Sequence, residues 1–213
     1  MTRARVERAV FGLYAVWMAV GLALTWRRAA VGPWGDVVLM ALAAAVVHLA
    51  LEARWGAGPA RRWLALVLAA SAAVEILGVR TGFPFGAYAY TGAFGFRLGP
   101  LPAAIPLAWY AVLGGWLAAV APAPRLSRAL LAGGWAAVFD ALLEPFAVQV
   151  KGYWIWQTPD GQPPAQNFIA WAAVGFLLAL AAPRDAGRAS RRPAAVLGSM
   201  LVLFELARFR YGI

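Results

Sequence analysis

Seven long apolar segments, separated by short stretches that hold most of the charged residues, limit the folds open to this chain. The segments cover roughly residues 9–26, 37–53, 63–79, 101–121, 129–150, 168–182 and 194–210. About 20 apolar residues, with ~17 as a lower bound, can cross the core of a bilayer as a helix. We therefore predict an all-α fold, a polytopic integral membrane helical bundle of about seven transmembrane helices, with six or eight as alternatives. Residues 1–213 are expected to form a single transmembrane domain.

The composition agrees with a membrane protein. Hydrophobic residues make up 63% of the 213-residue chain and charged residues only 13%, whereas a soluble domain carries about 25% charged residues. The net charge of +10 could suit a nucleic-acid partner, but the arginines lie in short clusters between the apolar segments. Because they form no basic face with interleaved aromatic residues, we predict membrane lipids and no nucleic acid as partners.

The arginine and lysine residues also predict an orientation. Twelve of the 19 lie at the N-terminus and in the stretches 54–62, 125–128 and 184–192, and the other seven belong to the opposite side. Since positive residues favour the cytoplasmic side, we expect a cytoplasmic N-terminus in the cytoplasmic (inner) membrane of a prokaryote. The loops 80–100 and 151–167 then share the non-cytoplasmic face. The first apolar run lacks a small-residue cleavage site and is expected to be a retained helix rather than a signal peptide.

These two loops are unusually aromatic. A loop between membrane helices needs only polar residues and turn formers, yet one stretch reads EILGVRTGFPFGAYAYT and the other KGYWIWQTPDGQPPAQNFIAW. We predict that the two stretches meet and bind an apolar substrate, because aromatic side chains commonly line the binding sites of apolar molecules. The predicted substrate-binding residues are Phe83, Phe85, Tyr88, Tyr90, Tyr153, Trp154, Trp156, Asn167, Phe168 and Trp171.

Three carboxylates lie in the apolar segments next to the aromatic loops, and we predict that they are catalytic. They are Glu75, Asp140 and Glu144. A carboxylate inside a bilayer costs a few kcal/mol and usually faces a partner or a cavity. Asp140 and Glu144 are four residues apart and share one helix face, where two acids do not both ionise easily. One of them can therefore hold a proton for acid catalysis. The alternative is a structural pair that ties helices together by hydrogen bonds.

Pro145 directly follows Glu144 and cannot donate a hydrogen bond to the carbonyl of Ala141. We therefore expect a kink that opens backbone groups toward a cavity or a neighbouring helix. Two other charged pairs have helical spacing, and we interpret them as structural pairs outside the site. They are His48 with Glu52 and Glu205 with Arg208.

Several kinds of chemistry are excluded by what the sequence lacks. It has no cysteine and one histidine, which excludes disulfides, thiolate metal sites and a multi-histidine metal centre. It also has no phosphate-binding glycine motif, dinucleotide fingerprint or nucleophilic serine elbow. We therefore predict acid–base chemistry on a lipid-soluble molecule, without a cofactor and without a metal.

Three motifs in the same order resemble those of a known family, the carotenoid biosynthesis membrane proteins. They are EILGVRTGFPFGAYAYT, then FDALLEPFAV, then GYWIW followed by PPAQNFIAW. The resemblance covers roughly residues 70–175, and the family includes hydratases that act on acyclic carotenoid end groups. It implies that the substrate is a carotenoid within the bilayer. It further implies that water adds across the terminal trisubstituted double bond and gives a tertiary alcohol.

A physical interpretation consistent with this resemblance gives roles to the predicted site. Asp140 or Glu144 would protonate the alkene, and Tyr88, Trp154 or Trp156 would stabilise the resulting tertiary cation. Glu75 or the partner acid would orient or deprotonate the attacking water. Two alternatives stay open: an end-group cyclase or isomerase, which shares the protonation step but excludes water, and a non-enzymatic membrane protein. The latter would bind a lipid or support other carotenoid enzymes.

Overall fold

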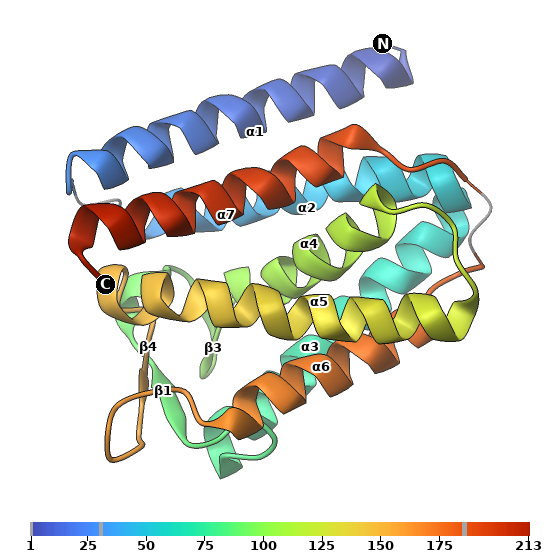
Figure 1. Ribbon diagram of the computed structural model, residues 1–213. Coiled ribbons are helices and arrows are strands. Elements are labelled where there is room, and N and C mark those ends of the chain that lie inside the picture. Colours follow the sequence, from blue (N-terminus) through green and yellow to red (C-terminus); the bar gives the residue numbers. More distant parts are fainter. Residues whose placement is uncertain (1, 30–31, 185–186) are drawn as a thin grey trace.

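The computed structural model describes residues 2–29, 32–184 and 187–213. The described residues form seven α-helices (Figure 1), which confirms the predicted all-α bundle. The helices are α1 (Arg3–Trp26), α2 (Pro33–Trp55), α3 (Ala57–Thr81), α4 (Ala104–Ala119), α5 (Arg125–Pro145), α6 (Ala165–Leu180) and α7 (Arg191–Tyr211). Short 3₁₀- and π-helical segments, η1 (Gly92–Phe94) and η2 (Phe146–Val150), lie in the loop after α3 and after α5.

Four of the helices are long and apolar enough to cross a membrane, among the residues that the structure describes. They cover Arg3–Trp26, Trp34–Trp55, Ala57–Thr81 and Arg125–Val150. The apolar helices α4 and α6 have 16 residues each and are about 24 Å long, shorter than a hydrocarbon core of about 30 Å. The helix α7 carries charged residues at both ends. The seven helices predicted from the sequence are therefore present, and four of them meet the length and composition of a span.

Two helix boundaries differ from the expected ones for identifiable reasons. The third helix begins at Ala57 rather than near residue 63, because Gly56 alone connects it to α2 with a φ of 86°, a conformation that glycine adopts at little cost. The fourth helix begins at Ala104 rather than at residue 101. Its expected first residues instead form β3 (Leu101–Pro102), which pairs with β2 (Arg97–Leu98).

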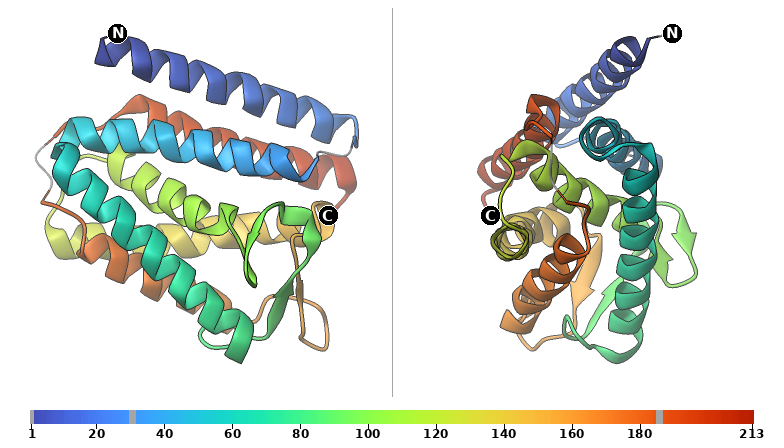
Figure 2. Two further views of the ribbon diagram at one scale, coloured as in Figure 1. Left: turned by 180° about the vertical axis from the view of Figure 1, so that it is seen from behind. Right: turned by 90° about the vertical axis from the view of Figure 1, so that its right-hand side faces the viewer.

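The short helix α4 occupies the centre of the bundle (Figure 2). It packs against α2, α3, α5, α6 and α7, and most of its side chains are buried. The other helices therefore surround it on most sides. By contrast, α1 runs along the outside of α2 and α7 (Figure 1).

Small residues bring α5 and α6 close together. A Cβ atom at Gly133 would lie 2.5 Å from the carbonyl oxygen of Ala172, and one at Gly175 would lie 2.8 Å from the Cβ of Ala136. Glycine at such positions allows two membrane helices to approach backbone to backbone. This approach places the start of α6, which carries Asn167, against the last turns of α5.

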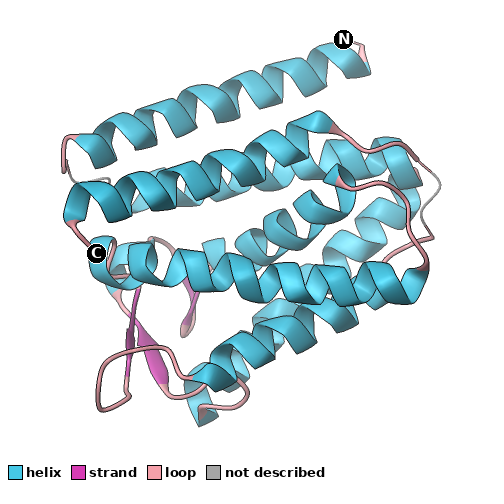
Figure 3. Cartoon of the chain, viewed as in Figure 1, coloured by secondary structure: helices cyan, strands magenta, loops and turns pink. Residues whose placement is uncertain are grey.

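The two aromatic loops meet, as predicted, and they do so by forming a short sheet (Figure 3). Strand β1 (Tyr88–Tyr90) pairs antiparallel with β4 (Trp154–Trp156), with Tyr88 opposite Trp156 and Tyr90 opposite Trp154. Because side chains alternate between the two faces of a strand, Tyr88, Tyr90, Trp154 and Trp156 share one face of the sheet. That face is directed toward the helices, since Trp154 and Trp156 are buried whereas Ile155 is exposed.

The helix geometry changes where Pro145 was expected to disturb it. The α-helical pattern of α5 ends at Pro145 and continues as the π-helix η2. Single π-helical turns of this kind are frequent at functional sites. At the end of this turn the carbonyl of Ala147 accepts a hydrogen bond of 2.9 Å from the backbone N–H of Tyr153, so the turn also anchors the start of the second aromatic loop.

Candidate active site

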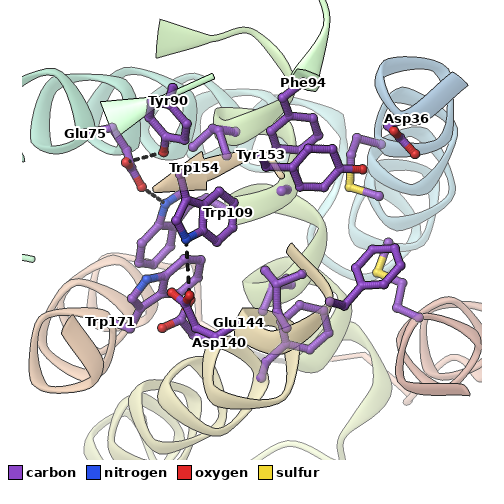
Figure 4. Close-up of a pocket in the computed structure, with 18 of the residues that line it drawn as sticks. Asp36, Glu75, Tyr90, Phe94, Trp109, Asp140, Glu144, Tyr153, Trp154 and Trp171 are labelled. Carbon is purple, nitrogen blue, oxygen red and sulfur yellow. Dashed lines mark hydrogen bonds between the residues drawn. The ribbon is translucent and has the colours of Figure 1, made fainter. Parts of the chain in front are cut away.

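A cavity of about 90 Å³ lies between the helices and the β1–β4 sheet (Figure 4). All three predicted catalytic acids and eight of the ten predicted binding residues line it. They are Glu75, Asp140, Glu144, Phe85, Tyr88, Tyr90, Tyr153, Trp154, Trp156, Asn167 and Trp171. The remaining lining is almost entirely apolar, so the acids face a largely apolar, aromatic space.

The structure places two predicted binding residues outside this lining. Phe83 is 66% exposed, because it follows the end of α3 at Gly82 and lies on the outer side of the loop. Phe168 directly follows Asn167 on α6, and adjacent helical residues point about 100° apart. Asn167 lines the cavity, and Phe168 is not part of its lining.

Glu75 is held by three neutral hydrogen-bond donors. The hydroxyls of Tyr88 and Tyr90 both donate to its Oε2 at 2.7 Å, and the indole Nε1 of Trp109 donates to its Oε1 at 2.8 Å. Burial, and then the nearby charge of Glu75, raise the pKa of the Tyr88 and Tyr90 hydroxyls. Both hydroxyls therefore keep their protons and remain donors to the carboxyl group of Glu75.

Glu144 also accepts from three neutral donors. The indole Nε1 atoms of Trp156 and Trp154 donate to its Oε2 at 2.9 and 3.1 Å, and the Nδ2 of Asn167 donates to its Oε1 at 3.4 Å. Two residues of one strand can reach the same carboxylate because residues i and i+2 point the same way. The WIW motif thus brings two N–H groups to one acid.

Asp140 differs from the other two acids in its hydrogen bonds. Among the described residues it accepts from Asn167 alone, whose Nδ2 donates to its Oδ2 at 2.5 Å. It lies beside Glu144 one helical turn away (Figure 4). Several neutral donors stabilise the ionised form of a carboxyl group, so these contacts favour Asp140, rather than Glu144 or Glu75, as the group that holds a proton.

Sequence reasoning did not identify Trp109, although this residue connects two parts of the site. Its indole donates to Glu75 and stacks on Trp171, with ring centroids 3.7 Å apart and planes 11° apart. The sequence carried no signal for it, because a tryptophan inside the apolar segment 101–121 has the appearance of an ordinary core residue. In the structure it links the acid of α3 to the wall formed by α6.

A second polar group, also not predicted, lies on another side of the cavity. Asp36, in the first turn of α2, forms an ion pair of 2.8 Å with the Nζ of Lys151. The hydroxyl of Tyr153 points toward Asp36 (Figure 4), and the ring of Tyr153 stacks on Phe94. Burial, and then the charge of Asp36, raise the pKa of Tyr153. This group joins the second aromatic loop to the start of α2.

The two pairs interpreted as structural lie outside the cavity lining. His48 bonds the hydroxyl of Tyr110 through Nδ1 at 2.8 Å and approaches Glu52 through Nε2 at 3.4 Å. Glu205 and Arg208 form an exposed pair at 3.4 Å. Among the described residues, no group of three or more histidine, aspartate or glutamate side chains could hold a metal ion.

Comparison with known proteins identifies the family. The sequence profile of the family described as "Carotenoid biosynthesis protein" matches residues 35–209. The chain therefore belongs to the carotenoid biosynthesis protein family, as its three motifs predicted. Because the chain belongs to this family and has helices long and apolar enough to cross a membrane, it is a membrane protein of carotenoid biosynthesis.

One curated relative is the bisanhydrobacterioruberin hydratase of Haloarcula japonica. It is 31% identical to this chain over 115 residues, which is 50% of this chain and 39% of the relative. The matched part thus spans about two fifths of that protein's length. No solved structure matches the chain.

Proposed function

We propose that this protein adds water to the terminal double bond of an acyclic carotenoid end group by acid catalysis. The observation that carries the proposal is the pairing of Asp140 with Glu144 in an aromatic cavity, where Glu144 has three donors and Asp140 has one. Such a difference in environment separates an acid that gives a proton from a carboxylate that stays ionised. The hydratase relative supports the same reaction class.

The proposed reaction begins with proton transfer from Asp140. The π electrons of the terminal double bond take the proton at the less substituted carbon, and the more substituted carbon becomes a tertiary cation. The oxygen of a water molecule then bonds to that carbon and loses one proton to a carboxylate. The net change is the addition of one water, and the tertiary alcohol carries no charge.

The remaining acids and the aromatic side chains would lower the energy of the cation. Fixed negative charge in an apolar site stabilises a developing positive charge more strongly than it would in water, and aromatic faces add cation–π attraction. Glu75 and Glu144, both fixed by three donors, are suited to this role and to accepting the proton of the attacking water. Transfer of this proton back to Asp140, from the carboxylate that accepted it, would complete the cycle.

Pigment analysis tests the proposal. The chain is expressed in cells that accumulate an acyclic or monocyclic carotenoid, and the pigments are compared by mass with those of cells carrying an empty vector. We expect a product heavier by one water per reacted end. An isomer of unchanged mass with a shifted absorption spectrum would instead indicate cyclisation. No new pigment with several substrates would favour a binding or scaffold role.

A further inference from the structure

A second cavity adjoins the first one near the loop end of the bundle. It has a volume of about 230 Å³ and lies among α1, α2, η2 and α7. Four residues line both cavities: Asp36, Leu39, Phe146 and Leu203. The side chains of these four residues therefore form part of the wall between the two spaces.

The first cavity is too small for a whole carotenoid. Its volume of about 90 Å³ lies well below the roughly 300–1,000 Å³ typical of sites for drug-sized ligands. The proposed reaction requires only that the end group reach Asp140. The long apolar chain of the substrate must then lie in a space that is continuous with the first cavity and accessible from the lipid.

The second cavity shares four lining residues with the first, so a rotation of shared side chains would connect the two spaces, and it borders the lipid-facing helix α1. Its α1 side is formed by Trp17, Val20, Gly21 and Leu24, and α1 is the outermost helix of the bundle (Figure 1). Trp17 and Val20 are exposed on the bundle surface, where a membrane helix meets lipid. The indole Nε1 of Trp17 donates to the carbonyl oxygen of Gly35 at 2.8 Å, which fixes this part of the wall against α2.

We propose that the second cavity binds the part of the polyene chain next to the end group, while the end group occupies the first cavity. This inference rests on the proposed function, because it locates the rest of the same substrate. Phe146 and Leu203 would form the passage between the cavities. The Asp36–Lys151 ion pair lines the second cavity beside the apolar residues, and its charges neutralise each other, so the polyene meets no unpaired charge there.

Gly21 offers a test, because it lines the second cavity and a Cβ atom built on it meets nothing within 4 Å. The Cβ atom of a Gly21→Phe variant therefore has room, and its ring is expected to occupy part of the cavity. Gly12→Phe is the matched control. Gly12 belongs to the same helix, is exposed, lies outside the lining of this cavity and also has nothing within 4 Å of a built Cβ.

Two measurements are made on the purified proteins: the full-length carotenoid retained per protein, and the hydration of a short acyclic isoprenoid with the same end group. We expect Gly21→Phe to lower retention and conversion of the full-length carotenoid by about tenfold, equivalent to ~1.4 kcal/mol of binding. Hydration of the short substrate should stay at the wild-type level, and Gly12→Phe should match wild type in both. Gly21→Leu gives the same comparison if the phenylalanine variant does not accumulate.

The inference is overturned if Gly21→Phe retains and converts the long carotenoid like wild type, or if it loses the long and short substrates equally. Failure of the proposed function has a different result. In that case the wild-type protein hydrates neither substrate, and the retention of carotenoid by the Gly21 and Gly12 variants still decides whether the cavity binds the polyene.

Discussion

Replacing Asp140 with asparagine is expected to lower the rate of water addition by about 10²- to 10⁴-fold, the usual contribution of a general acid. Asparagine has the shape of aspartate, and its side-chain oxygen can still accept the hydrogen bond from Asn167. It has no proton acidic enough to transfer to an alkene. The loss is measured as the fraction of carotenoid converted in isolated membranes, relative to the amount of protein.

Glu205→Gln is the matched control for this experiment. Glu205 is a carboxylate on a helix of the same bundle, but it is exposed and pairs with Arg208, so its neutralisation should leave conversion unchanged. Asp140→Glu keeps an acidic proton and should retain more activity than Asp140→Asn. Full activity in the asparagine variant would show that Asp140 is a structural acid and would remove it from the mechanism.

Replacing Glu75 with glutamine is expected to lower activity by at least about 10²-fold while the protein stays folded. The tyrosine hydroxyls can accept as well as donate hydrogen bonds. The new amide can therefore donate to Tyr88 and Tyr90 while its oxygen accepts from Trp109. The negative charge that we propose to stabilise the cation and to receive the proton would nevertheless be lost. Conversion of carotenoid and the melting temperature in detergent are measured together.

Glu75→Ala separates charge from packing at this position. It leaves the buried hydroxyls and the indole without an acceptor, and each unsatisfied donor costs about 1–3 kcal/mol, so its melting temperature should fall clearly below that of Glu75→Gln. Glu52→Gln, at a helix carboxylate outside the cavity lining, should change conversion little. Wild-type conversion by Glu75→Gln would contradict the role of its charge.

Much of the architecture could be predicted because apolar run length and intramembrane acids are strong signals. The long runs set the seven helices, and the loops beside Glu75 and Glu144 contained the residues that meet around the cavity. The register of β1 on β4 could not be predicted, since each strand has three residues. Such short apolar strands fit several pairings, and tertiary contacts decide among them.

The parts of the site that were missed depend on contacts far apart in the chain. Trp109 donates to a carboxylate 34 residues away, and no local pattern marks that contact. Asp36 lies in the first turn of α2, where an acid is already favourable because of the helix dipole. Only the fold shows that it pairs with Lys151 beside the cavity.

The central claim is that the protein adds water to the carotenoid by acid catalysis. Tracing the origin of the added oxygen and hydrogen atoms tests it most directly. The purified protein is incubated with an acyclic carotenoid in water enriched in heavy oxygen, and separately in deuterium oxide, and the product is examined by mass spectrometry. Acid-catalysed hydration predicts that the new hydroxyl carries oxygen from water and that the neighbouring carbon carries one deuterium. A hydroxyl whose oxygen comes from O₂, or a product without added oxygen, would contradict the account.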